Sequence, residues 1–284
     1  ETNFDVWLKV MDFSRIHTLK LGQRAQWGGT YTLTHRLAET LPPHLVSLKN
    51  LEVKNAIGGK FIVNLPKNVS LTHLTWREPW AEPDYDPGIF TGFLLGDILQ
   101  RHGSTLETLH FHSHDTGQYG GCPDLGSYHG LGTILKQIPN IKKLTLGLRR
   151  PFIHDWPWKD LKKLATELPN LTDLTIYFDL AYLPCQTPPY TPPSPCHPTN
   201  EKWNKDCMGR DAYAQPMVSK SEGEKIARFL AQQRATVVGG KPFQRIRIRS
   251  GNGGWGTEGG YMSGSIVGKS AWDWIDGKST WVSC

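Results

Sequence analysis

The sequence contains no run of about 18 apolar residues, which excludes a membrane-spanning helix. It has only five cysteines in 284 residues, an odd number and too few for a small secreted domain held by disulfides. We therefore expect a reducing compartment, the cytoplasm or nucleus, with a secreted protein as the alternative. The hydrolase signatures G-x-S-x-G and H-E-x-x-H are also absent. We expect a protein that is not an enzyme and needs no cofactor.

Hydrophobic residues make up 38% of the chain, enough to exclude a wholly disordered protein. The length fits one large domain or an array of stacked repeats. The net charge of +6 is modest, and no basic run is interleaved with aromatic residues. Nucleic acid is therefore a minor alternative as a partner.

One short pattern recurs along the chain. Residues 138–146 and 168–176 resemble each other, and both reduce to apolar-x-x-apolar-x-apolar. The last two apolar positions are two residues apart, so they share one face of a strand, and each copy predicts a short strand. The seven copies are Ile16/Leu19/Leu21, Leu48/Leu51/Val53, Leu71/Leu74/Trp76, Leu106/Leu109/Phe111, Ile141/Leu144/Leu146, Leu171/Leu174/Ile176 and Phe243/Ile246/Ile248.

Apolar residues with helical spacing lie between several of these copies. They predict helices around 93–99, 131–138, 161–168 and 226–230. A strand followed by a helix, repeated along the chain, predicts an α/β solenoid in which each unit buries its apolar face against its neighbours. The strands would form a parallel sheet on the inside, with helices and loops outside.

The L-x-x-L-x-L core of these copies resembles the leucine-rich-repeat superfamily, over roughly residues 4–250. The long, irregular units with helical outer sides resemble those of divergent fungal F-box/leucine-rich-repeat proteins. The resemblance implies about seven irregular repeats that select a protein substrate for a cullin-type ubiquitin ligase. The F-box that would bind the ligase adaptor is not visible ahead of the first repeat, so it would lie outside this chain.

We expect the solenoid to span residues 1–250 and to be followed by a tail, residues 251–284. Two regions interrupt the repeating pattern, one within the solenoid and the other the tail itself. Residues 183–216 are rich in proline, which cannot donate to a sheet, and they form an insertion within one repeat. The insertion is either a surface loop or a docking segment for a partner. Residues 251–284 are rich in glycine and tryptophan, and we expect a cap over the last repeat.

Residues that alternate with the core positions should line the concave face of the sheet, about 30 Å across, where a protein partner would bind. An expected loop at 78–92 adds aromatic residues at one edge of this face. The candidate partner-binding residues on the face and the loop are Arg77, Trp80, Tyr85, His110, His112, Lys143, Asp173, Tyr177, Arg245, Arg247 and Arg249.

His110, His112 and His114 alternate along one expected strand and are followed by Asp115. Imidazoles two residues apart on a strand can share a transition metal with a nearby carboxylate, which makes a metal site one alternative. A pH-sensitive contact surface is a second, because histidine titrates near neutrality. A solvated strand face without further function is the third.

Overall fold

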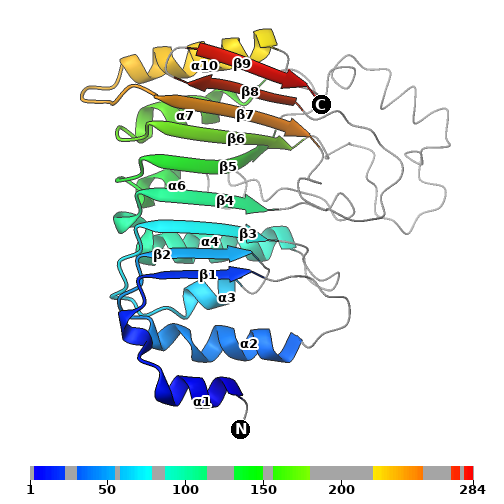
Figure 1. Cartoon of the computed structure of the whole chain (residues 1–284). Helices are drawn as coiled ribbons and strands as arrows, with labels where there is room; N and C mark the ends of the chain where they lie inside the picture. The colour runs from blue at the N-terminus through cyan, green and yellow to red at the C-terminus, as the bar shows by residue number, and fades with distance from the viewer. Residues whose placement is uncertain are drawn as a thin grey trace, which may run out of the picture.

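A computed structural model describes residues 3–22, 31–54, 58–78, 87–113, 131–149, 156–179, 220–251, 270–275 and 278–283. The fold is α/β, with one sheet of nine strands that follow each other in chain order (Figure 1). The first seven strands are mutually parallel, β8 runs antiparallel to them, and β9 runs antiparallel to β8. The strands are β1 (Thr18–Gly22), β2 (Asn50–Lys54), β3 (His73–Glu78), β4 (Thr108–Ser113), β5 (Lys143–Arg149), β6 (Asp173–Asp179), β7 (Arg245–Gly251), β8 (Ser270–Ile275) and β9 (Lys278–Ser283).

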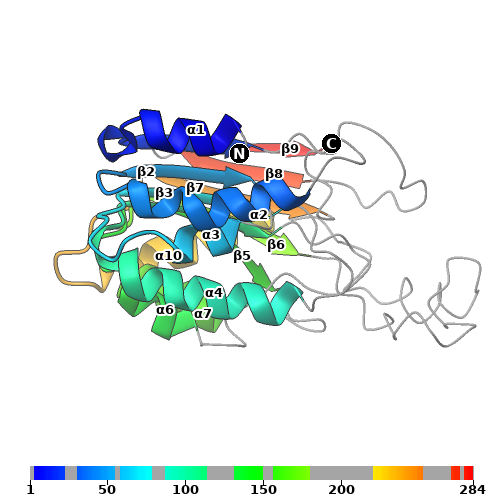
Figure 2. The same cartoon turned by 90° about the horizontal axis from the view of Figure 1, so that it is seen from below.

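The helices that follow the strands gather on one side of the sheet, and the strands trace a shallow arc with its concave side turned away from them (Figure 2). At the β1 end of the sheet lie α1 and α2 (Figure 1). Short 3-10 turns occur at Phe13–Arg15, Pro42–His44 and Gly103–Thr105. The helices are α1 (Asn3–Val10), α2 (Tyr31–Thr40), α3 (Gly58–Val63), α4 (Pro87–His102), α6 (Leu131–Gln137), α7 (Trp158–Glu167) and α10 (Lys220–Ala235).

The same backbone turn recurs where each parallel strand begins. The carbonyl oxygen of His17 accepts the N–H groups of Lys49 and Asn50, both at 2.9 Å. The arrangement returns at 2.8–3.1 Å on the carbonyl oxygens of Lys49, Thr72, Glu107, Lys142 and Thr172. One carbonyl thus fixes two consecutive donors of the next unit, and this sets the register of each strand against the one before it.

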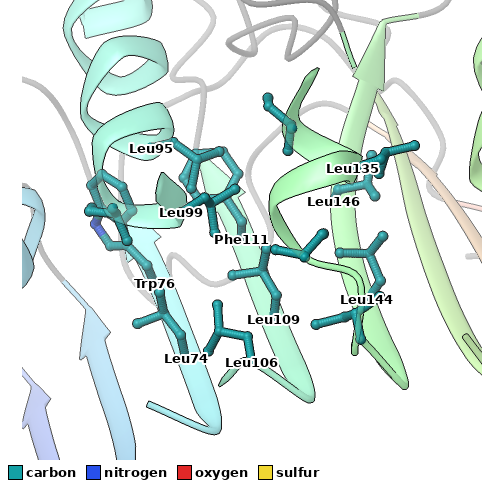
Figure 3. Close-up of a cluster of buried hydrophobic side chains, with 14 of the residues drawn as sticks. Leu74, Trp76, Leu95, Leu99, Leu106, Leu109, Phe111, Leu135, Leu144 and Leu146 are labelled. Atoms are coloured by element: carbon teal, nitrogen blue, oxygen red, sulfur yellow. The ribbon is translucent and has the colours of Figure 1, made fainter. Parts of the chain in front are cut away.

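The apolar triplets fill the space between the sheet and its helices. Leu74, Leu109 and Leu144 lie in register on three adjacent strands, each at most 3% exposed. Next to this row, the rings of Trp76 and Phe111 meet edge to face, with centroids 5.3 Å apart. Figure 3 shows these side chains beneath Leu95, Leu99 and Leu135 of the helices. Each unit therefore buries its apolar residues against its neighbours' strands and helices.

The structure confirms the seven predicted strands as parallel neighbours in one sheet. Helices α4, α6, α7 and α10 stand where helical spacing predicted them, whereas α1, α2 and α3 were not predicted. The expected loop at 78–92 is wrong from Pro87 onward, because α4 begins there. Proline suits the first helical position, where its missing N–H has no partner to lose. The 183–216 insertion and all five cysteines lie outside the described residues.

The described parts of the 251–284 tail extend the sheet. Strand β8 pairs with β7 in the antiparallel direction, and β9 pairs with β8. Trp274 of β8 packs against the core on the helical side. Thus the strand direction reverses after β7.

The end of α4 is tightly enclosed. His102 is 1% exposed, and its Nδ1 lies 3.1 Å from the carbonyl oxygen of Val69. Burial lowers the pKa of His102 below its ordinary value near 6.5, and the positive charge of Arg101 adds to this, against the opposing effect of the Val69 carbonyl. Gly103 follows, and a Cβ atom there would lie 2.4 Å from the carbonyl oxygen of Gln137.

Gly103→Ala should destabilise the protein, because the new methyl group must displace the backbone of the next unit. We expect a loss of about 1–3 kcal/mol in the free energy of unfolding, measured by urea denaturation. Gly132→Ala is the matched control, since a Cβ there comes no closer than 3.6 Å to the Glu167 carboxylate. As a helical glycine, Gly132 should give unchanged or higher stability, by up to about 1 kcal/mol. Equal losses in both variants would contradict the close approach at Gly103.

His102 should make the protein less stable at acid pH. The unfolded chain takes up a proton on this residue as the pH falls below about 6.5, while the buried neutral ring resists protonation. Stability is therefore lost between pH 6.5 and the lower pKa of the folded state, and levels off below that. His102→Gln keeps a donor for the Val69 carbonyl but does not titrate. We expect urea denaturation of this variant at several pH values to show a smaller loss of stability on acidification, and equal pH profiles would refute the assignment.

Candidate functional site

The face of the sheet opposite the helices is lined by polar side chains, and we call it the polar face. Its residues alternate along each strand with the buried apolar ones, because successive side chains of a strand point to opposite faces. The described members are Thr18, Lys20, Asn50, Glu52, His73, Thr75, Thr108, His110, Lys143, Thr145, Asp173, Thr175, Tyr177, Arg245, Arg247, Arg249 and Asp273.

At the β1 end, neighbouring strands of the polar face are joined by exposed contacts. Lys20 and Glu52, which are in register, form an ion pair of 3.6 Å, with the Lys20 side chain 73% exposed. Asn50 donates from its amide to the hydroxyl of Thr18 at 3.0 Å. Contacts this exposed contribute little to stability because water and salt screen them.

The centre of the polar face is less accessible to water. Thr108 and Thr145 are 7% and 8% exposed, although no described helix covers them. The Nδ1 atom of His110 lies 2.6 Å from the hydroxyl oxygen of Thr145, its neighbour in register on β5. Glu107, at the entrance to β4, accepts a hydrogen bond from Lys142 that lowers the pKa of its carboxyl group. Side chains here contact their neighbours across the strands.

Positive charge gathers on the last parallel strand. Arg245, Arg247 and Arg249 all point to the polar face from β7. The Nη1 atom of Arg245 lies 3.4 Å from Oδ1 of Asp173 on β6. Arg249 donates to Oδ1 of Asp273 on β8, and both of these side chains are mostly buried. Arg245 thus pairs with a carboxylate of β6, and Arg249 pairs with a carboxylate of β8.

The middle arginine, Arg247, has no acidic partner in the described part of the chain. Asp273 stands directly opposite Arg247 in the β7–β8 register, but its carboxylate is bonded to Arg249. Among the described residues, the structure gives Arg247 no hydrogen bond or ion pair, and its Nε atom is buried. Lys143 is similar, since Asp173 lies beside it in register but pairs with Arg245. An arrangement of this kind can accept an anion from another molecule.

Most of the predicted partner-binding residues with described side chains come together here. Lys143, Asp173, Tyr177 and the three arginines lie on three adjacent strands, and His110 lies one strand further away. The backbones of Arg77 and His112 are paired in β3 and β4, but their side chains are not described. Two further partner-binding candidates, Trp80 and Tyr85, and two metal candidates, His114 and Asp115, lie outside the described residues.

Sequence reasoning missed Asp273 as a member of the site. The tail was treated as a cap, so its side chains were not assigned to a face. The alternation of Ala271-Trp272-Asp273-Trp274-Ile275 is nevertheless typical of a half-buried strand, and it would have placed Asp273 opposite the tryptophans. Its pairing with Arg249 follows only from the reversed direction of β8.

In the part of the chain that the structure describes, no three or more His, Cys, Asp or Glu side chains are grouped so that they could bind a metal ion. The metal alternative built on His110, His112, His114 and Asp115 stays a prediction, because most of its side chains are not described. None of the described helices has both the length and the apolar character needed to cross a membrane.

Comparison of the chain with protein-family models, with curated proteins and with solved structures found no match.

The two kinds of ion pair on the polar face should differ in their effect on stability. Asp273→Asn weakens a charge-assisted hydrogen bond between mostly buried side chains, and we expect a loss of about 1–3 kcal/mol. Lys20→Gln breaks a pair whose lysine is 73% exposed, and we expect a change below about 0.5 kcal/mol. Urea denaturation of both variants at low and moderate salt tests this. A larger effect at Lys20 would contradict the burial that the structure gives to the two pairs.

Proposed function

We propose that this chain is a protein-recognition module of the leucine-rich-repeat kind, which binds a partner protein on its polar face. The observation that carries the proposal is a face of polar side chains, continuous across seven parallel strands, with no described helix on it. At about 4.8 Å between strands, the nine-stranded sheet is about 38 Å wide. A face of this width accommodates the area of about 800 Å² per partner that stable protein interfaces bury.

The repeated backbone turn supports the relationship to leucine-rich repeats. Six carbonyl oxygens, each at the entrance to a strand, accept two consecutive N–H groups from the next unit. The apolar residues of each unit then point to the same side as the helices. This is the arrangement that a solenoid of strand-and-helix units requires, since every unit contacts mainly its neighbours.

The resemblance to F-box repeat proteins suggests which class of partner protein the polar face binds. We propose that the partner is a substrate of a cullin-type ubiquitin ligase in the cytoplasm or nucleus, and that an F-box outside residues 1–284 binds the ligase adaptor. Within this proposal the repeats select the substrate and contribute no catalytic group. The full-length protein should then co-purify with ligase subunits. If it does not, the ligase role is wrong, while recognition on the polar face would stand.

A photoreactive amino acid placed at Thr175 tests recognition on the polar face. Thr175 is a partly exposed residue of β6 on that face, next to Arg247, so irradiation in an extract of the source cells should yield one discrete conjugate with a partner protein. The control carries the same group at Lys162, an exposed position of α7 on the helical side. Conjugates with the same protein from both positions, or from Lys162 alone, would contradict the proposal.

A further inference from the structure

We propose that Arg247 is the anchor of the polar face and binds a carboxylate from an acidic segment of the partner protein. This inference rests on the recognition function proposed above and names the chemistry of its partner. Arg247 is the middle one of three arginines on β7, and the other two, Arg245 and Arg249, hold the two nearby carboxylates. A guanidinium group has five N–H donors and no acceptor, so an unpaired one calls for an anion.

The burial of Arg247 makes an external anion favourable. Its Nε atom is buried, and no partner for it occurs in the described part of the chain. The side chain as a whole is only partly buried, so its terminal nitrogens can meet a ligand oxygen, and this contact would offset part of the free energy that an unpartnered guanidinium costs. Thr175, its neighbour in register on β6, is partly exposed and could donate its hydroxyl hydrogen to the same ligand. A carboxylate has two oxygens and can accept from both side chains.

The charge of the surroundings favours a carboxylate over a phosphate. On β5 to β8, the described side chains of the polar face include the cations Lys143, Arg245, Arg247 and Arg249 and the anions Asp173 and Asp273. Two positive charges are therefore in excess, and they come from different strands, Lys143 on β5 and Arg247 on β7. A single carboxylate neutralises Arg247, whereas a phosphate of about −1.5 to −2 would need more donors at one point. A second acidic residue of the same segment can be attracted by Lys143.

Selection from a displayed library of random peptides against the whole chain tests the proposal. We expect the enriched peptides to share an Asp or Glu residue, and synthetic copies to lose about tenfold or more in affinity for Arg247→Gln. The matched control is Arg228→Gln, which removes an exposed arginine from α10 on the helical side and should leave the affinity unchanged. Enriched peptides without an acidic residue, or peptides that bind Arg247→Gln equally well, would overturn the inference. So would a phosphoserine copy that binds more tightly than the carboxylate peptide.

A rescue experiment tests the position of Asp273. In Arg249→Gln the carboxylate of Asp273 loses its partner and can pair with Arg247, which lies directly opposite. We expect this variant to bind the acidic peptide less tightly although Arg247 is intact. Adding Asp273→Asn removes the competing carboxylate and should restore the affinity. An equal loss in the single and the double variant would overturn the account of Arg247 as the group that binds the peptide.

The outcomes also separate this inference from the proposed function. Peptides that crosslink from Thr175 but bind independently of Arg247 would overturn the carboxylate anchor and keep recognition on the polar face. If the selection enriches no peptide that crosslinks from Thr175, the role of Arg247 as a carboxylate-binding anchor is overturned. If Thr175 also yields no protein conjugate in the extract, the proposed recognition function fails as well.

Discussion

The repeated pair of hydrogen bonds at the strand entrances is the constraint on which the rest of the structure depends. Each accepting carbonyl fixes where the next strand begins, so all seven parallel strands share one register. A shift by one residue would exchange the two faces of a strand and expose its aliphatic side chains. The apolar rows under the helices and the polar rows on the opposite face are therefore two results of the same backbone geometry.

The same register decides which charges on the polar face neutralise each other. Asp173 has Lys143 on one side and Arg245 on the other, and Asp273 can reach two arginines of β7. Each of these carboxylates pairs with one cation, so Lys143 and Arg247 have no acidic partner among the described residues. Composition and net charge do not reveal which cations lack an acidic partner, because the pairing depends on which side chains lie opposite each other in the sheet. The location of an unpaired guanidinium is a property of the fold.

Much of the fold could be predicted because each aliphatic triplet indicates both where a strand lies and which of its residues face the core. Helices with a clear apolar spacing, such as the one containing Leu161, Leu164 and Ala165, were also predictable. The segment Gly58–Val63 was not, since a six-residue helix with two glycines shows no helical period. The candidate site was found in outline through Arg245, Arg247 and Arg249. Its organisation required the direction of β8 and the rotamers of the aspartates, which no local pattern encodes.

The antiparallel pair β8–β9 has a consequence for how copies of this chain meet. A sheet built from parallel units could be lengthened by the first strand of another molecule, and repetition of that step would give a fibre. Beyond β7, however, the neighbouring position is occupied by a strand that runs the opposite way. The edge of β7 is therefore already paired, and the first strand of another molecule cannot add to it. The pair β8–β9 thereby shields the last parallel strand from the first strand of another copy, and it leaves β9 as the outermost described strand at this end of the sheet.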